Sequence, residues 1–180
     1  MTGALLIEDL ADDPGPEVRR ELADCWTAVT DAGGAVGFAA PADVPAVEAA
    51  VDELLGGLHP DRCRLLLARL DGELAGWVAL SRGANPLVAH WGIVQRLQVH
   101  PAVQRGGIGR ELMRAVHRSA ASELGLDHLH LTARSGMGLE DFYARLGYRE
   151  VGRWPGALRV APGDDRDEVL LFLDLTADAG

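Results

Sequence analysis

The residues best suited to chemistry lie in one glycine-rich segment, residues 97–113, which reads LQVHPAVQRGGIGRELM. This segment predicts a buried strand, a turn at Pro101, a glycine loop and then an amphipathic helix. A loop that enters a helix directly leaves several backbone N–H groups without partners, and the helix dipole adds positive potential there. Glycines also let a ligand approach the main chain without meeting a Cβ atom. The segment therefore predicts an anion site, for which phosphate is the usual ligand.

The helix after the loop is predicted from its period, because Ile108, Leu112, Val116 and Ala120 recur every four residues. Two other nucleotide-binding loops fit less well. A dinucleotide-binding unit would place a third glycine where Ala115 stands. A Walker loop needs a lysine, and this chain has no lysine. The glycine loop alone is weak evidence, so its context has to decide the type of site.

Composition narrows the class of protein. The chain has 180 residues, of which 48% are hydrophobic, so we expect one core and a single domain over residues 1–180. A formal net charge of −10 argues against nucleic acid or an anionic membrane as a partner. No apolar run approaches the length of a membrane span, and no secretory signal is apparent. We expect a cytoplasmic protein in which Cys25 and Cys63 are reduced thiols.

Hydrophobic periodicity and turn signals predict a mixed α/β domain of the α+β type. Strands are predicted at 4–10, 63–70, 73–81, 91–100, 127–133, 148–153 and 168–175. Helices are predicted at 17–30, 43–55, 108–124 and 139–146. A loop is expected over 155–167, with the acidic segment 164–167 as its solvated tip.

Two motifs in this order resemble those of the GCN5-related N-acetyltransferases (GNAT family). Gln104, Gly107 and Gly109 match motif A, Q/R-x-x-G-x-G/A, and residues 141–148, DFYARLGY, are similar to motif B. The predicted order of elements is also that of the family. The resemblance implies a mixed, mostly antiparallel sheet of about seven strands flanked by four helices. It also implies that the fourth and fifth strands splay apart and that the fourth carries a bulge.

The resemblance further implies that acetyl-CoA, as the acyl donor, binds in the gap between those two strands. The backbone at Leu97, Gln98 and Val99 would hold the pantetheine arm and the thioester, in effect as an added strand. The glycine loop would wrap the pyrophosphate, and arginines would meet the outer phosphates. The other residues that the resemblance implies for cofactor binding are Gln104, Arg105, Gly106, Gly107, Ile108, Gly109, Arg110, Phe142 of motif B and Arg145.

The chemistry to be explained is attack of an amine on a thioester. The amine must first lose a proton, the carbonyl oxygen needs an N–H donor, and the leaving thiolate needs a proton. By resemblance, the main chain around Val99 supplies the N–H donor and Tyr143 protonates the thiolate. The alternative is that Tyr143 is only a core side chain, since Leu139, Phe142, Tyr143 and Leu146 follow a helical core period.

The sequence departs from the family pattern at two positions. Ile93 stands where many members carry a glutamate that acts as a base through water, and Gly136 stands where an asparagine is common. Three interpretations stay open: another residue orders the water, the acceptor amine arrives with a lowered pKa, or the protein binds acyl-CoA without catalysing. Candidates for the first are His90, Asp31, Glu140 and Asp141.

Residues 31–38 and 148–156 resemble more closely the tabtoxin-resistance subgroup, whose members acetylate a small amino-bearing toxin. Ala157 replaces an aromatic residue there, and Ile93 and Thr132 replace acidic residues, so the acceptor is expected to differ. We therefore expect an acetyl-CoA-dependent N-acetyltransferase acting on the amine of a small molecule, with a toxin or antibiotic among the acceptor types. A non-catalytic acyl-CoA-binding protein, another acyl-CoA or a hydroxyl acceptor are the alternatives. Homodimers are common among similar proteins.

Two remaining features have simple interpretations. His128 and His130 alternate along one predicted strand, which would suit a metal, but no third ligand is suggested and cross-strand packing is favoured. Trp154 precedes Pro155 at the start of the predicted loop that would cover the acceptor site.

Overall fold

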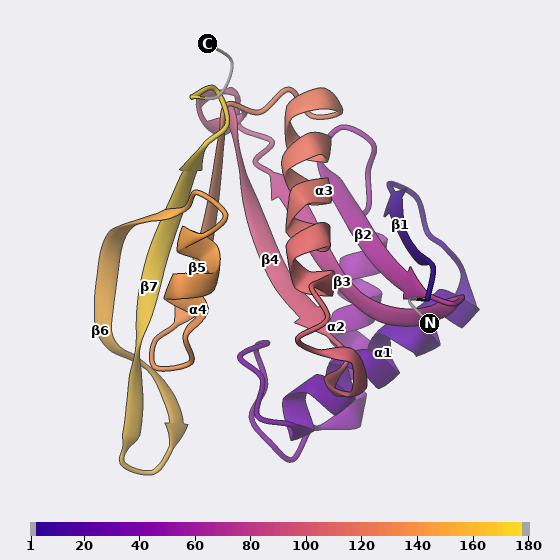
Figure 1. Ribbon diagram of the computed structural model, residues 1–180, viewed down its shortest axis with the longest axis vertical. Helices are drawn as coiled ribbons and strands as arrows, with labels where there is room; N and C mark the ends of the chain where they lie inside the picture. Colours follow the sequence, from indigo (N-terminus) through magenta and orange to yellow (C-terminus); the bar gives the residue numbers. More distant parts are fainter. Residues whose placement is uncertain (1–2, 178–180) are drawn as a thin grey trace.

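Seven strands form one mixed sheet in the order β1-β2-β3-β4-β5-β7-β6 in the computed structural model, which describes residues 3–177 (Figure 1). Every neighbouring pair is antiparallel except β4 and β5. The strands are β1 (Leu5–Leu10), β2 (Cys63–Leu70), β3 (Glu73–Arg82), β4 (Trp91–Val99), β5 (His128–Arg134), β6 (Arg149–Ala161) and β7 (Asp164–Asp174). The helices are α1 (Pro16–Asp31), α2 (Val44–Gly56), α3 (Ile108–Ser122) and α4 (Leu139–Ala144). The predicted fold class, sheet and helices are confirmed.

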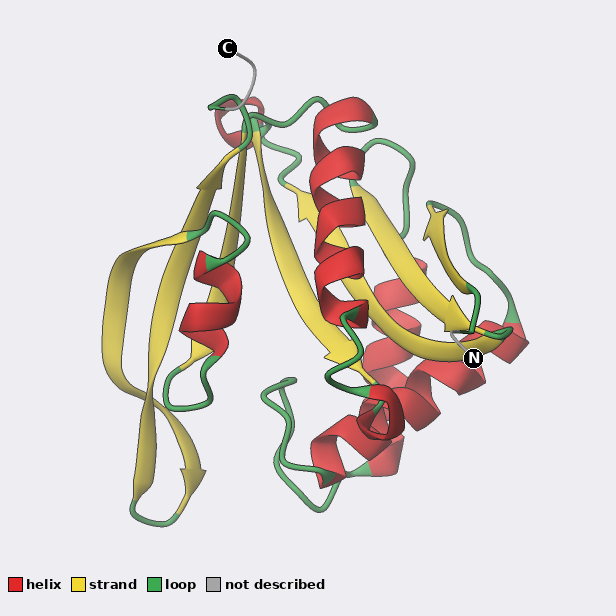
Figure 2. Cartoon of the chain, in the orientation of Figure 1, coloured by secondary structure: helices red, strands yellow, loops and turns green. Residues whose placement is uncertain are grey.

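The helices cover both faces of the sheet, with α3 and α4 on one face and α1 and α2 on the other (Figures 1 and 2). Strand alternation explains this arrangement, because successive side chains of β2 point to opposite faces. Leu65 and Leu67 pack in the core beneath α1 and α2, where Trp77 is fully buried. Leu66 contributes to the other core, beneath α3. The described residues include no helix with both the length and the apolarity needed to cross a membrane.

Local signals explain where the helices begin. Pro16 lies in the first turn of α1, and the Asp43 carboxylate accepts a hydrogen bond from the Ala46 N–H at the start of α2. Helix α3 begins after Gly107, whose φ of 85° is a left-handed conformation that favours glycine. The predicted apolar stripe of α3 is confirmed, because Ile108, Leu112, Val116 and Ala120 are all buried.

Strands β4 and β5 pair at one end only. Their parallel ladder joins Trp91–Ile93 to His128–His130 and then stops, so the two strands diverge beyond it (Figure 1). The β3–β4 register shifts between Trp77 and Ala79, and Arg96 opposite this shift has a φ of 58°. The Arg96 guanidinium lies 4.5 Å from the ring centroid of Trp26, which holds this bulge against α1. The predicted bulge and splay are thus confirmed.

The segment after α4 was predicted incorrectly. The expected strand 148–153, loop 155–167 and strand 168–175 are instead a long hairpin of β6 and β7 joined at residues 162–163. Residues 164–167 therefore belong to β7 and are not a loop tip. Pro155 and Gly156 are tolerated because β6 is the edge strand and its ladder shifts between Trp154 and Leu158. The other boundaries differ from prediction by at most two residues.

The two histidines of β5 are packing residues, as predicted. His128 lies 5.0 Å from the ring of Phe172, and His130 lies 4.8 Å from the ring of Trp91, measured between centroids. Within residues 3–177, no group of three or more His, Cys, Asp or Glu side chains is placed to hold a metal ion.

The unfolding free energy is expected to fall as the pH is lowered from about 6.5 to about 4. Burial, assisted by the charge of Arg118, lowers the pKa of His117 from 6.5 to about 4. In that interval the unfolded chain binds a proton that the folded protein excludes, so stability rises with pH. His117→Phe keeps the ring beside Tyr148 and removes the titration.

Urea unfolding at pH 7 and pH 4.5 measures this effect. The wild type should lose about 1–3 kcal/mol more than His117→Phe over this interval, allowing for solvent screening of a partly buried group. Equal losses in the two proteins would show that titration of His117 does not cause the loss of stability at acidic pH.

Candidate active site

The space between the diverging strands is a cavity of about 650 Å³, which we call the β4–β5 cavity. Its walls are the bulged end of β4, the facing part of β5, the glycine loop, the start of α3, α4, and the end of α1 with the loop that follows it. All but one of the residues that the sequence assigned to cofactor binding or catalysis line it: Leu97, Gln98, Val99, Gln104, Arg105, Gly107, Ile108, Gly109, Arg110, Phe142, Tyr143 and Arg145. Gly106 does not. The fold thus brings the two sequence motifs to one cavity.

The glycine loop presents unpaired donors to the β4–β5 cavity. Among the described residues, the backbone N–H groups of residues 104–109 donate no hydrogen bond, whereas those of Arg110 and Glu111 bond to the Gly107 carbonyl. The Gln104 side-chain amide donates to the Val99 carbonyl over 3.0 Å, which ties the loop to β4. A Cβ atom at Gly107 would meet nothing within 4 Å, so the main chain is open there. This is the backbone arrangement that anion binding requires.

The charge of the β4–β5 cavity is opposite in sign to that of the whole chain. Four arginines line it, and no aspartate or glutamate does, although the chain carries a formal net charge of −10. Among the described residues, Arg105, Arg110 and Arg145 take part in no ion pair. The fourth, Arg96, packs over Trp26. These uncompensated cations suit a ligand with several phosphate groups.

Two neighbouring tyrosines have different surroundings. Tyr143 of α4 is 8% exposed and lines the β4–β5 cavity, while its ring packs 5.0 Å from that of Phe142. Tyr148 lines no described cavity wall, and its hydroxyl is buried without a hydrogen-bond partner among residues 3–177. Burial raises the pKa of Tyr143 well above its ordinary range, so its hydroxyl keeps its proton at neutral pH. The ring therefore serves packing and the hydroxyl is available as a donor.

A second cavity, of about 830 Å³, adjoins the first, and we call it the hairpin cavity. It is bounded by the loop after α1, the end of β5 and the β6–β7 hairpin. The two cavities share six lining residues: Gly33, Gly34, Ala35, Thr132, Ala133 and Met137. A molecule in the hairpin cavity would thus lie next to one in the β4–β5 cavity.

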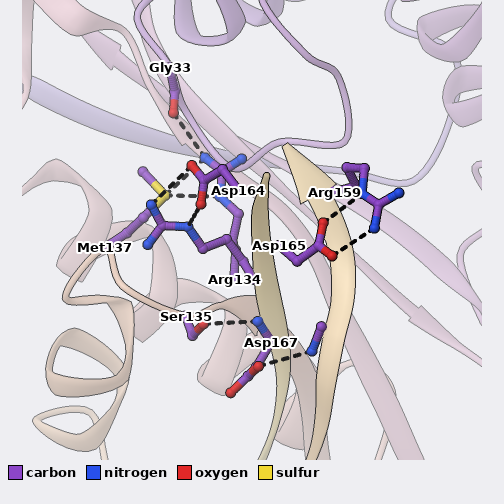
Figure 3. Close-up of polar contacts among 10 residues, drawn as sticks. Gly33, Arg134, Ser135, Met137, Arg159, Asp164, Asp165 and Asp167 are labelled. Carbon is purple, nitrogen blue, oxygen red and sulfur yellow. Dashed lines mark hydrogen bonds and ion pairs between the residues drawn. The ribbon is translucent and has the colours of Figure 1, made fainter. Parts of the chain in front are cut away.

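Most charged side chains around the hairpin cavity are paired (Figure 3). Arg159 bonds to Asp165 over 2.6 Å, and Arg166 pairs with Asp164. Two lining residues, Arg134 and Glu168, form no ion pair among the described residues. They stand directly opposite each other on β5 and β7.

Several candidates from the sequence lie elsewhere. His90, Asp31, Glu140 and Asp141 line neither cavity, and the Asp31 carboxylate instead accepts from the Ala42 N–H. Trp154 is 66% exposed and also lines neither cavity. Sequence reasoning missed Arg134 and Glu168. The only signal for them was their pairing across two strands, which becomes visible once the start of β7 is placed correctly.

Comparison with known proteins identifies the domain that contains the β4–β5 cavity. The family model for the acetyltransferase (GNAT) domain matches residues 61–150, half of the 180-residue chain. This matched part contains β2 to β5, the glycine loop, α3 and α4.

Solved structures share the fold over nearly the whole chain. A protein assigned as a phosphinothricin N-acetyltransferase superposes with a TM-score of 0.80 at 17% identity, covering 96% of this chain and 99% of that one. A GNAT acetyltransferase from Streptococcus pneumoniae gives 0.75 at 20% identity, covering 94% and 98%. An aminoglycoside 6′-N-acetyltransferase in complex with coenzyme A gives 0.71 at 17% identity, covering 94% and 97%.

Proposed function

The chain belongs to the GNAT acetyltransferase family, and on that premise we propose that it moves an acetyl group from acetyl-CoA to the amine of a small molecule. The observation that carries this proposal is the β4–β5 cavity. In an acidic protein, this cavity is lined by four arginines and by five glycine-loop residues whose backbone N–H groups have no partner among the described residues: Gln104, Arg105, Gly107, Ile108 and Gly109. It adjoins the hairpin cavity, which offers space for the acceptor.

The residues of the β4–β5 cavity fit the chemistry of acetyl-CoA. We assign the pyrophosphate to the N–H groups of residues 104–109 and the outer phosphates to Arg105, Arg110 and Arg145. The backbone of Leu97–Val99 would pair with the amide-bearing arm, since β4 has no partner strand on its β5 side there. When bound, acetyl-CoA supplies the thioester carbonyl that the amine attacks.

The chain's own groups then account for the proton transfers. Tyr143 is assigned the donation of a proton to the leaving thiolate, because its hydroxyl is protonated and its ring lines the cavity. The residue at the usual base position, Ile93, has no ionisable group and lines neither cavity. Of the two carboxylates in the hairpin cavity, Asp164 is held by Arg166, which leaves Glu168 to accept the proton of the attacking amine.

Glu168→Gln is expected to lower kcat/KM for the acceptor by about 10²-fold at pH 7, the usual contribution of a positioned base. The deficit should shrink as the pH approaches about 10, where an alkylamine loses its proton in solution. A steady-state pH profile measures this. Glu140→Gln is the matched control, since Glu140 lines neither cavity. An unchanged kcat/KM in Glu168→Gln would remove the base assignment.

The acceptor, location and assembly are the finer parts of the proposal. Fold likeness to a protein assigned as a phosphinothricin N-acetyltransferase and to an aminoglycoside 6′-N-acetyltransferase supports an acceptor of the toxin or antibiotic type. The free thiols Cys25 and Cys63 support a cytoplasmic location. We also propose a single acetyltransferase domain over residues 1–180, with a homodimer as the assembly.

An acceptor panel tests the proposed function. Purified protein is incubated with acetyl-CoA and a set of amines, and CoA release is followed with cofactor hydrolysis subtracted. We expect at least one amine to give CoA and acetylated amine in equal amounts. Release that never exceeds hydrolysis, or that accompanies acetylation of hydroxyl acceptors only, would contradict amine transfer.

A further inference from the structure

Arg134 is a cation held in place without a counter-ion. It lies at the end of β5 and reaches across to the loop after α1, where its Nη2 donates to the Gly33 carbonyl over 3.0 Å (Figure 3). Its Nε and Nη2 also contact the Met137 sulfur at 3.2 and 2.9 Å. A thioether is a weak acceptor and carries no charge. The two N–H groups of Nη1 donate to no described residue.

The surroundings of Arg134 separate it from the other arginines of the hairpin cavity. Arg159 and Arg166 are each paired with an aspartate, through Nε and Nη2 in both cases. Arg134 instead keeps only its Nη1 side open. Because a guanidinium stays charged at any working pH, the free Nη1 is a site for a carboxylate, which it can bind through a charge-assisted hydrogen bond.

Glu168 supplies the opposite charge in the same cavity. Its backbone is paired with that of Arg134, and directly opposed residues of an antiparallel pair project their side chains to the same face. Neither side chain forms an ion pair among the described residues. One small molecule with an ammonium group and a carboxylate would complement both.

We infer that the acceptor is an amino-acid-like zwitterion whose carboxylate binds the open side of Arg134 while its amino group faces Glu168. This inference rests on the proposed function, because it takes the hairpin cavity as the acceptor site. It narrows the acceptor from amines in general to amines that also carry a carboxylate. Neutral amines and polyamines without an acid group lack the partner for Arg134.

The test uses α- and ω-amino acids, each paired with its own carboxamide, so that the two members of a pair differ by one charge. Binding of each to the protein saturated with CoA is measured by calorimetry, and transfer is measured with acetyl-CoA. Arg134→Gln removes the charge and keeps a side chain that can donate to Gly33. Arg159→Gln is the matched control, because Arg159 lines the same cavity but is already paired.

For at least one pair, the wild type should bind the acid about 10- to 100-fold more tightly than the amide, the usual effect of one charge-assisted hydrogen bond. Arg134→Gln should lose this preference, with acetyl-CoA affinity and thermal midpoint unchanged, and Arg159→Gln should keep it. Equal binding of acid and amide by the wild type, binding of no acid, or a preference that persists in Arg134→Gln would overturn the inference.

If acids bind preferentially but no amine is acetylated, the proposed function fails and the carboxylate site stands. If neutral amides are acetylated as well as acids, the function stands and the inference fails.

Discussion

Tyr143→Phe is expected to lower turnover by about 10²–10⁴-fold, the usual contribution of a positioned general acid. The change keeps the ring and its contact with Phe142 but removes the only transferable proton. Acetyl-CoA affinity and the free energy of unfolding should change little, because no described residue hydrogen-bonds to this hydroxyl. Steady-state turnover, calorimetric affinity and thermal unfolding of the same preparation measure the three quantities.

The pH dependence of this defect distinguishes acid catalysis from packing. The thiol of CoA has a pKa near that of cysteine, about 8.5, so the thiolate leaves unaided as the pH rises. The defect of Tyr143→Phe should therefore shrink toward pH 9, whereas the raised pKa of Tyr143 keeps the wild-type donor protonated over this interval. A defect that is independent of pH, or turnover that survives the substitution, would assign Tyr143 to the core alone.

Tyr148→Phe is the matched control for this experiment. Tyr148 lies 5.7 Å from Tyr143 between ring centroids, but its hydroxyl is buried without a partner and lines neither cavity. Removal of an unsatisfied buried hydroxyl should leave turnover unchanged and the protein no less stable.

Gly107→Glu is expected to weaken acetyl-CoA binding by well over tenfold. The substitution places a carboxylate among the N–H groups assigned to the pyrophosphate, and it puts a side chain where phosphate must approach main chain. Titration calorimetry of the folded variant measures the loss. Wild-type affinity in Gly107→Glu would remove the glycine loop from the cofactor site.

Gly125→Glu controls for backbone strain in this experiment. Gly107 and Gly125 both have positive φ, 85° and 60°, and a Cβ atom at either would meet nothing within 4 Å. The conformational cost of the two substitutions is therefore similar, on the order of 1–2 kcal/mol. Only Gly107 lines the β4–β5 cavity, so Gly125→Glu should bind acetyl-CoA normally.

The parts that sequence predicts best are those set by local signals. The helix after the glycine loop follows from a four-residue apolar period and from Gly107 at its start. The hairpin of β2 and β3 follows from Asp71-Gly72, a strong turn signal. The residues assigned to the cofactor and to acid catalysis are similarly local, since the strand end with its glycine loop and the motif around Tyr143 are each one short segment.

The parts that sequence misses are set by contacts between distant segments. Pro155 and Gly156 are strand breakers in isolation, but the edge position of β6 and the Asp167 carboxylate, which accepts from the Gly156 N–H over 3.0 Å, keep them in a strand. The acceptor side of the site depends on this hairpin. Arg134 and Glu168 are 34 positions apart and become neighbours only through the β5–β7 register.

The crystal structure of the acetyl-CoA complex tests the central claim most directly, namely that the β4–β5 cavity holds the donor and delivers its acetyl group to the hairpin cavity. We predict that the pyrophosphate contacts the backbone N–H groups of residues 104–109, that the sulfur faces the Tyr143 hydroxyl, and that the acetyl group points toward Arg134 and Glu168. A donor bound outside the β4–β5 cavity, or one whose acetyl group points away from the hairpin cavity, would contradict it.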